Sequence, residues 1–202
     1  MKSNFNKFPE VKIDGHVCYS GWDAVINEIR CAITTNKSKK IVLAIECYHG
    51  VFVKEILRHI EKEMQPALLI NAASAMKDES VIAEMVQPFV TDDPVFGFIT
   101  ALELNNYFDK EKIAGVHKSI NEIEKGVVIV IGAGAMLVCE NPYLVIYADM
   151  PRWEIQLRFR RDAVANLGRT NKTDSFAYKY KHAYFVDWRV CDRYKKEIFQ
   201  DI

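Results

Sequence analysis

The segment that decides the fold is IVLAIECYHGVFVKEIL, residues 41–57. It opens with a continuous apolar run, and a short turn from Glu46 to Gly50 follows. Beyond the turn, apolar residues recur at the spacing of one helix face: Val53, Ile56, Leu57, Ile60 and Met64. A strand that is apolar on both faces, followed by an amphipathic helix, is typical of a parallel sheet packed between helices.

Three further apolar runs repeat this pattern along the chain. They are ALLI (67–70), VVIVI (127–131) and LVIYA (144–148). Helices are expected around residues 22–29, over 109–124, and after Pro151, whose missing N–H costs nothing at a helix start. Strands that alternate with helices predict a three-layer α/β fold with a mostly parallel, doubly wound sheet.

Three segments depart from this regular pattern. Residues 85–98 contain two prolines and a glycine, which predicts a long loop or a broken segment. The polar stretch 168–175 is predicted to be a linker. Residues 183–188 are rich in aromatic side chains and predict a strand, which a short helix follows.

Composition limits the class of protein. The 202 residues are 50% hydrophobic, which suffices for one sizeable core and predicts a single domain. Lys plus Arg and Asp plus Glu each number 27, so bulk charge favours neither nucleic acid nor a membrane surface as a partner. The cysteines are scattered, as expected of buried thiols in a reducing compartment. Without an apolar stretch suited to a signal peptide or a membrane span, the sequence predicts a cytoplasmic protein.

The turn after the first strand lies where a P-loop protein binds phosphate. In that motif, backbone N–H groups of a Gly-rich turn cradle the phosphate, a lysine neutralises it, and a hydroxyl holds magnesium. Aligned on the second glycine of the motif, residues 45–52 are IECYHGVF, with Gly50 in the glycine position. Val51 replaces the lysine and Phe52 replaces the hydroxyl residue. Taken alone, the motif also fits a plain strand-to-helix turn in which Gly50 supplies a tight backbone.

Later segments resemble the uridine kinase branch of the P-loop kinases, and they occur in the same order. TDDPVFGF (91–98) is similar to the stretch beside the phosphate acceptor, and GVVIVIGAGAML (126–137) is similar to a later core strand. YLVIYADMPRWEIQLRFRRD (143–162) resembles the final strand and the arginine-bearing helix that closes over the nucleotide. The resemblance covers roughly residues 38–165 and implies a P-loop NTPase fold.

Over nearly the whole chain, four longer phrases resemble the N-terminal region of two-domain bacterial class I mannose-6-phosphate isomerases. They are ECYHGV, VTDDPVFG, YADMPRWEIQLRFRRDAVANLG and YFVDWRVCDRYKK. In that family a kinase-like domain precedes a cupin isomerase domain. The resemblance implies that residues 1–202 are the kinase-like half, with a core at about 38–165 and an aromatic and basic extension at 176–202. The cupin, with its zinc ligands and isomerase chemistry, is absent, and such a cupin isomerase domain is an expected partner.

Three departures from the kinase pattern remove groups that phosphoryl transfer needs. Val51 is not a lysine, Asn71 replaces an expected carboxylate, and the acidic residue expected after the VVIVI strand is missing. Positioning and charge neutralisation supply most of the catalysis in this reaction, so we expect transfer to be slow or absent. Both a binding domain and an enzyme are therefore compatible with the sequence.

Other residues can take over parts of the phosphate site. Glu46 and Asp93 are candidates to hold a metal such as the Mg²⁺ of an ATP complex, and Asp93 is also the candidate catalytic residue beside the acceptor. His49 is a candidate phosphate ligand at the start of the helix, together with the backbone of Gly50.

Arg158 and Arg161 lie three residues apart and therefore share one face of the predicted helix. Two guanidinium groups on one face can grip a phosphate. The alternative is an ion pair in which Glu154 neutralises Arg158 on a solvated face. Residues 178–196 add bases and aromatic side chains, which either extend the anion site or form a solvated charged face over packed aromatic rings.

Two other kinds of site have only partial motifs. A dinucleotide site is not predicted, because Leu137 stands where the fingerprint needs a small residue and the GAGAML segment follows a late strand. A zinc site from two His and Cys pairs would require the N-terminal segment to pack on the turn. Its ligands would be His16, Cys18, Cys47 and His49.

Three functional hypotheses follow. The first is a degenerate kinase-like domain that binds a phosphorylated small molecule, a nucleotide or a sugar phosphate, and works with mannose-6-phosphate isomerase in carbohydrate metabolism. The second is an active nucleoside or sugar kinase that uses ATP, with Asp93 at the acceptor and the two arginines on the donor phosphates. The third is a structural or oligomerising module, in which Tyr48, Val51 and Phe52 occlude the surface around Gly50.

Overall fold

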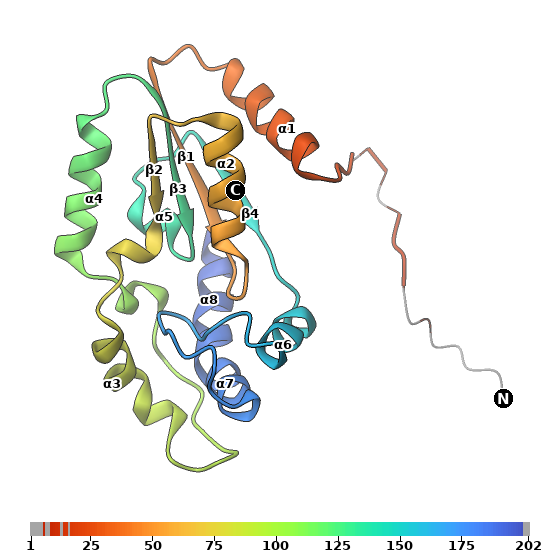
Figure 1. Ribbon diagram of the computed structural model, residues 1–202, viewed down its shortest axis with the longest axis vertical. Coiled ribbons are helices and arrows are strands. Elements are labelled where there is room, and N and C mark those ends of the chain that lie inside the picture. Colours follow the sequence, from red (N-terminus) through yellow and green to blue (C-terminus); the bar gives the residue numbers. More distant parts are fainter. Residues whose placement is uncertain (1–5, 7–8, 13, 16, 200–202) are drawn as a thin grey trace.

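The computed structural model describes residues 6, 9–12, 14–15 and 17–199 of the chain. Its centre is a four-stranded parallel sheet with the order β2-β3-β1-β4 (Figure 1). The strands are β1 (Lys40–Cys47), β2 (Leu68–Asn71), β3 (Gly126–Gly132) and β4 (Leu144–Ala148). The four predicted strands and their parallel arrangement are confirmed.

Strand β1 is central because it pairs with a neighbour on each edge. Lys40 to Glu46 pair with β3, and Leu43 to Cys47 pair with β4. The carboxyl end of β1 therefore lies in the middle of the sheet edge, between the ends of β3 and β4. In parallel α/β sheets this edge is where ligands bind.

Both faces of the sheet are buried, each against its own hydrophobic core. Leu43 and Ile45 of β1 pack with Ile26 of α1 (Trp22–Thr34) and Ile60 of α2 (Val53–Met64). Ala44, between them in sequence, faces the opposite core. This alternation explains the continuous apolar runs, since strands with helices on both sides have no solvated face.

The remaining helices contribute to the second core or lie at its border. They are α3 (Glu79–Val90), α4 (Lys110–Glu122), α5 (Ala135–Val138), α6 (Arg152–Arg160), α7 (Phe176–His182), α8 (Trp188–Ile198), the 3₁₀ turns η1 (Ala72–Ala75) and η2 (Leu104–Tyr107), and the π-helical segment η3 (Ala183–Asp187). Helices on both faces make this a three-layer α/β domain. None of the described helices combines the length and apolar composition that a membrane crossing requires.

The predicted break at residues 85–98 is wrong in its first half, because α3 runs through Pro88 to Val90. Ile82, Val86 and Val90 form a buried stripe at helical spacing. Pro88 lies in the last turn on an exposed position, where it removes one backbone donor. Burial of the stripe outweighs that loss, and the irregular loop begins only at Thr91.

The predicted strand at 183–188 is also wrong. Residues 183–187 form the π-helical segment η3, which joins α7 to α8 in one helical run. The buried positions Ala183, Val186 and Val190 recur at helical spacing and pack into the second core. Aromatic and β-branched residues have only a weak intrinsic preference for strands, and packing of this stripe overrides it.

Gly134 gives a stability test of the fold. Its φ is +79°, and an added Cβ would lie 2.4 Å from Cζ of the buried Phe108. We expect Gly134→Ala to lower the free energy of unfolding by about 2–4 kcal/mol, through backbone strain and overpacking.

The matched control is Gly115→Ala in the middle of α4, where an added Cβ meets nothing within 4 Å. That change should raise the free energy of unfolding by about 0.5–1 kcal/mol, because alanine favours helix. Urea denaturation of both variants measures the difference, and equal effects of the two changes would contradict the account of Gly134.

Candidate functional site

An open cleft of about 840 Å³ lies at the carboxyl ends of β1, β2 and β3. Its walls are the β1–α2 turn (47–55), the residues that follow β2 (71–79), the start of the turn after β3 (132–133) and the segment 163–172. Most of the lining surface is apolar. The third hypothesis expected an occluded surface around Gly50 and is wrong on this point, because Tyr48, Val51 and Phe52 line an open cavity.

The β1–α2 turn depends on Gly50. Its φ is +89°, a conformation that favours glycine, and a Cβ there would lie 2.8 Å from Cγ1 of Ile155. The Val51 N–H donates to the Tyr48 carbonyl at 3.2 Å, which closes the turn. The predicted glycine position is thus a tight turn that leads directly into α2, and its backbone forms part of the cleft wall.

Arg158 supports this turn from the side of α6. Its Nη1 donates to the Gly50 carbonyl at 2.8 Å, and its guanidinium lies 3.7 Å from the centre of the Phe52 ring. Glu154 accepts from Arg158 Nε at 2.9 Å and from Arg161 Nη2 at 3.0 Å. The predicted pair with Glu154 is therefore present. Neither guanidinium belongs to the cleft wall, and Arg161 is exposed.

Glu46 is buried below the cleft and is not part of its wall. Its Oε1 accepts from the Gly134 N–H at 2.6 Å, and its Oε2 accepts from the Met136 N–H at 3.0 Å. Burial raises the pKa of this carboxyl to about 7, although the backbone hydrogen bonds oppose the shift. Glu46 therefore ties β1 to the turn after β3.

Asp93 lies away from the cleft, in the exposed loop after α3. Its Oδ1 accepts from the Phe96 N–H at 2.6 Å and from the Val95 N–H at 2.7 Å. These backbone hydrogen bonds hold the pKa of the carboxyl below its usual value. The structure does not bring Asp93 together with Glu46 or with the β1–α2 turn.

The donors around the cleft do not fit a metal ion. Within the described part of the chain, no three His, Cys, Asp or Glu side chains are grouped closely enough to hold one. Phe52, at the position of the P-loop hydroxyl, has no oxygen for Mg²⁺. His16, one ligand of the zinc site considered from sequence, lies outside the described residues.

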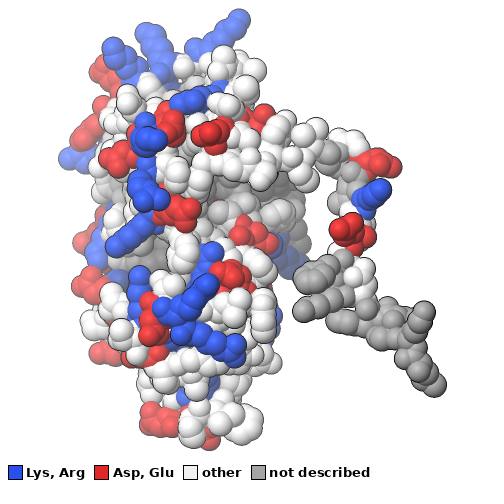
Figure 2. Space-filling model, turned by 45° about the vertical axis from the view of Figure 1, so that its right-hand side comes forward, with Lys and Arg blue, Asp and Glu red and all other residues white. Residues whose placement is uncertain are grey.

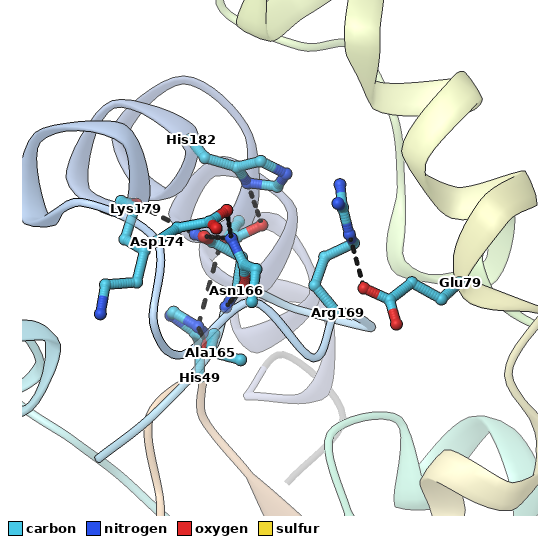
Figure 3. A network of polar contacts seen from close by, with 10 residues as sticks. His49, Glu79, Ala165, Asn166, Arg169, Asp174, Lys179 and His182 are labelled. Atoms are coloured by element: carbon cyan, nitrogen blue, oxygen red, sulfur yellow. Dashed lines mark hydrogen bonds and ion pairs between the residues drawn. The ribbon is translucent and has the colours of Figure 1, made fainter. Parts of the chain in front are cut away.

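His49 lines the cleft and belongs to a buried polar cluster in its wall. Its Nε2 is 3.0 Å from the Ala165 carbonyl oxygen and 3.8 Å from Asp187 Oδ2. Asn166 Nδ2 donates to the same Oδ2 at 2.6 Å, and His182 Nδ1 is 3.0 Å from Oδ1. Figure 3 shows these side chains converging from three separate segments. The cluster therefore joins the β1–α2 turn, the 163–172 segment and the C-terminal helices.

Asp187 is fully buried and carries the charge of this cluster. Burial raises the pKa of its carboxyl, but His182, His49 and Asn166 outweigh burial and bring the pKa below its ordinary value. A buried carboxylate needs such partners, because the loss of its hydration is costly. The cluster thus fixes the back wall of the cleft by electrostatic attraction.

The π-helical segment η3 explains why His182 can reach Asp187. In an α-helix, side chains five residues apart point about 140° away from each other. In a π-helix the hydrogen bond joins residues five apart, which places their side chains on nearly the same side. A separation of five residues does not indicate contact in an ordinary α-helix, so the sequence did not identify His182 and Asp187 as a pair.

The cleft wall also carries basic residues that motif comparison did not identify. Lys54 and Arg58 come from α2, four residues apart, and Lys77 and Lys172 come from two other walls. Within the described residues, none of these four has a carboxylate within 4 Å. A fifth cation, Arg169, pairs with Glu79 at 3.1 Å, as Figure 3 shows.

The cleft therefore differs in charge from the chain as a whole. Its wall contains five Lys or Arg side chains and two carboxylates, Glu55 and Glu79, whereas the chain is neutral overall. Figure 2 shows acidic and basic side chains mixed over the face in view. The spacing of Lys54 and Arg58, four residues apart, could have indicated two cations on one side of a helix. The same spacing is typical of an ordinary solvent-exposed helix face, so it did not identify the cleft.

Two basic residues of the C-terminal helices have a different role from either one expected. Lys179 is buried, and its Nζ donates to the Phe159 carbonyl at 2.9 Å and to Asp162 Oδ1 at 2.6 Å. Lys181 is buried as well and donates to backbone carbonyls of the loop after α3. These lysines neither extend the anion site nor form a solvated face. The aromatic rings pack into the core, as the alternative predicted.

Comparison with known proteins assigns no activity to this site. The family model described as Domain of unknown function (DUF8485) matches residues 21–202. No curated protein and no solved structure gives a significant match.

The burial of Glu46 predicts a pH dependence of stability. The ordinary pKa of a glutamate, 4.5, applies to the unfolded chain, and the pKa of Glu46 in the folded chain is about 7. Between pH 4.5 and pH 7 the folded state therefore holds more protons than the unfolded state. The free energy of unfolding should therefore fall as pH rises from 4.5 to 7, by about 3 kcal/mol from this group.

Chemical denaturation across this pH range measures the effect in wild type and in Glu46→Gln, which should lack this part of the slope. The control is Glu122→Gln, an exposed glutamate on α4. A slope that Glu46→Gln leaves unchanged would contradict the assignment.

Proposed function

The chain belongs to this family of unknown function, and from the cleft itself we propose that the domain binds a phosphorylated small molecule, a nucleotide or a sugar phosphate. The observation that carries the proposal is the excess of cations in a mostly apolar cleft of a neutral chain. Unpaired cations in a concave, low-dielectric wall attract and retain anions. The cleft volume also lies in the range of small-molecule sites.

The layout of the β1–α2 connection supports a degenerate P-loop kinase-like domain. A central parallel strand runs into a tight glycine turn, and a helix begins at Val53 beside the cleft. Lys54 lies three residues beyond Val51, the position of the missing P-loop lysine, and lines the same cavity. We assign to Lys54 and Arg58 the neutralisation of the ligand phosphate.

Binding without phosphoryl transfer fits this site better than catalysis. Transfer needs a metal held against the phosphates and a group that orients the acceptor. Phe52 cannot ligate Mg²⁺, and Asp93 lies outside the cleft. Association with a sugar-phosphate isomerase rests on the sequence resemblance, so mannose 6-phosphate is one of the ligands to be tested.

Calorimetric titration tests the proposal with ATP, GTP, UTP and mannose 6-phosphate, each beside adenosine or mannose as the unphosphorylated control. At least one phosphorylated compound should bind, and its affinity should fall with rising salt. Lys54→Ala should weaken that binding about tenfold, the cost of one hydrogen bond to a charged group.

The matched variant is Lys118→Ala, an exposed lysine of α4 outside the cleft wall. It should leave affinity unchanged. The proposal fails if none of the four phosphorylated compounds binds at millimolar concentration, or if both lysine variants bind as wild type does.

A further inference from the structure

The loop after α3 lies at the lower end of the molecule in Figure 1. It exposes large apolar side chains. The exposed fractions are 62% for Val95, 70% for Phe96, 67% for Phe98 and 54% for Ile99. Single exposed apolar residues are common on protein surfaces, but a contiguous group marks an interaction site. We refer to residues 91–99 as the apolar loop.

The apolar loop is held in one conformation by its own hydrogen bonds. Besides the two backbone N–H groups bound by Asp93, the Thr91 hydroxyl donates to the Phe96 carbonyl at 2.8 Å. The Phe98 N–H donates to the Phe89 carbonyl at 2.8 Å. The loop is therefore ordered before any partner binds, which lowers the entropy cost of association.

The base of the apolar loop is fixed by a buried lysine. Lys181 Nζ donates to the carbonyl of Thr91 at 3.3 Å and to that of Asp93. Gly97 passes so close to the Phe89 carbonyl that an added Cβ would lie 2.4 Å from its oxygen. Lys181 and Gly97 thus hold the loop in a conformation that leaves its apolar side chains exposed to solvent. Burial of apolar surface during folding does not explain this exposure.

Charge restricts what can bind the apolar loop. Asp92 and Asp93 are exposed in it, and residues 91–99 contain no Lys or Arg. The complementary surface is apolar with basic residues at its edge. The cleft has this character, because its wall is mostly apolar and carries Lys54, Arg58 and Lys77.

The loop does not line the cleft of its own chain. We propose that the apolar loop of one copy docks into the cleft of a second copy, so that the chain associates head to tail. A two-fold contact between two such loops would bring their carboxylates together, whereas loop into cleft places them against cations. This contact does not require the phosphorylated ligand, which would compete with the loop for the same cleft and for Lys54.

The size of the loop predicts that the association is weak. An aromatic side chain buries about 150–250 Å², so the exposed parts of these four residues offer roughly 400 Å². A standard interface takes about 800 Å² from each partner. The contact therefore belongs to the transient class, and Phe96, the most exposed residue of the group, is its expected anchor.

Sedimentation velocity at rising protein concentration tests the proposal with two variants, Phe96→Ser in the loop and Lys54→Glu in the cleft. Wild type should associate, more strongly at low salt, and each variant alone should associate at least about tenfold more weakly. An equimolar mixture of the two variants should form dimers but nothing larger, because it retains one intact loop and one intact cleft.

The control is Val81→Ser, an exposed apolar residue of α3 outside the loop and the cleft wall, which should associate as wild type does. Circular dichroism checks that each variant is folded. The proposal is overturned by a wild type that stays monomeric, by variants that associate normally, or by a mixture that does not regain dimers. Phe96-dependent binding to phosphatidylcholine vesicles without self-association would overturn it in favour of a membrane surface.

Discussion

Burial of the central strand is the constraint on which the rest of the structure depends. Strand β1 is paired on both edges and packed on both faces, so its direction and register are fixed by β3, by β4 and by two separate cores. A shift of one residue would move Leu43 and Ala44 each to the opposite core. The turn at Gly50 and the start of α2 are consequently held at one place on the sheet edge.

Two buried carboxyl groups near this strand join segments that are distant in sequence. Glu46 joins β1 to the turn after β3, and Asp187 joins the C-terminal helices to His49 and Asn166. Both carboxylates act as structural cross-links between segments distant in sequence. Glu46 does not line the cleft, and the charged side chains of the wall are mainly cationic, with Glu55 and Glu79 as its carboxylates.

The resemblance to P-loop kinases concerns two features, the order of the elements around Gly50 and the carboxylates expected to bind a metal. A strand, a glycine turn and a helix follow one another at residues 40–64, and Arg158 donates to the Gly50 carbonyl. The carboxylates that were candidates for metal binding do not meet, since Glu46 is buried under the cleft and Asp93 shapes a distant loop. A mostly apolar cleft with an excess of cations, and with no metal-binding group among the described residues, is the basis of the proposed binding role.

The sequence by itself determined the strands, their parallel arrangement and the glycine turn, because apolar runs and helical spacing are local signals of burial. It did not determine the helical course of residues 183–187, since aromatic and β-branched residues favour a strand locally and only packing into the core overrides that preference. Nor did it determine the site. Lys54, Lys77 and Lys172 are ordinary surface lysines until packing brings three distant segments to one cleft, and His49 and Asp187 become partners only across the tertiary fold.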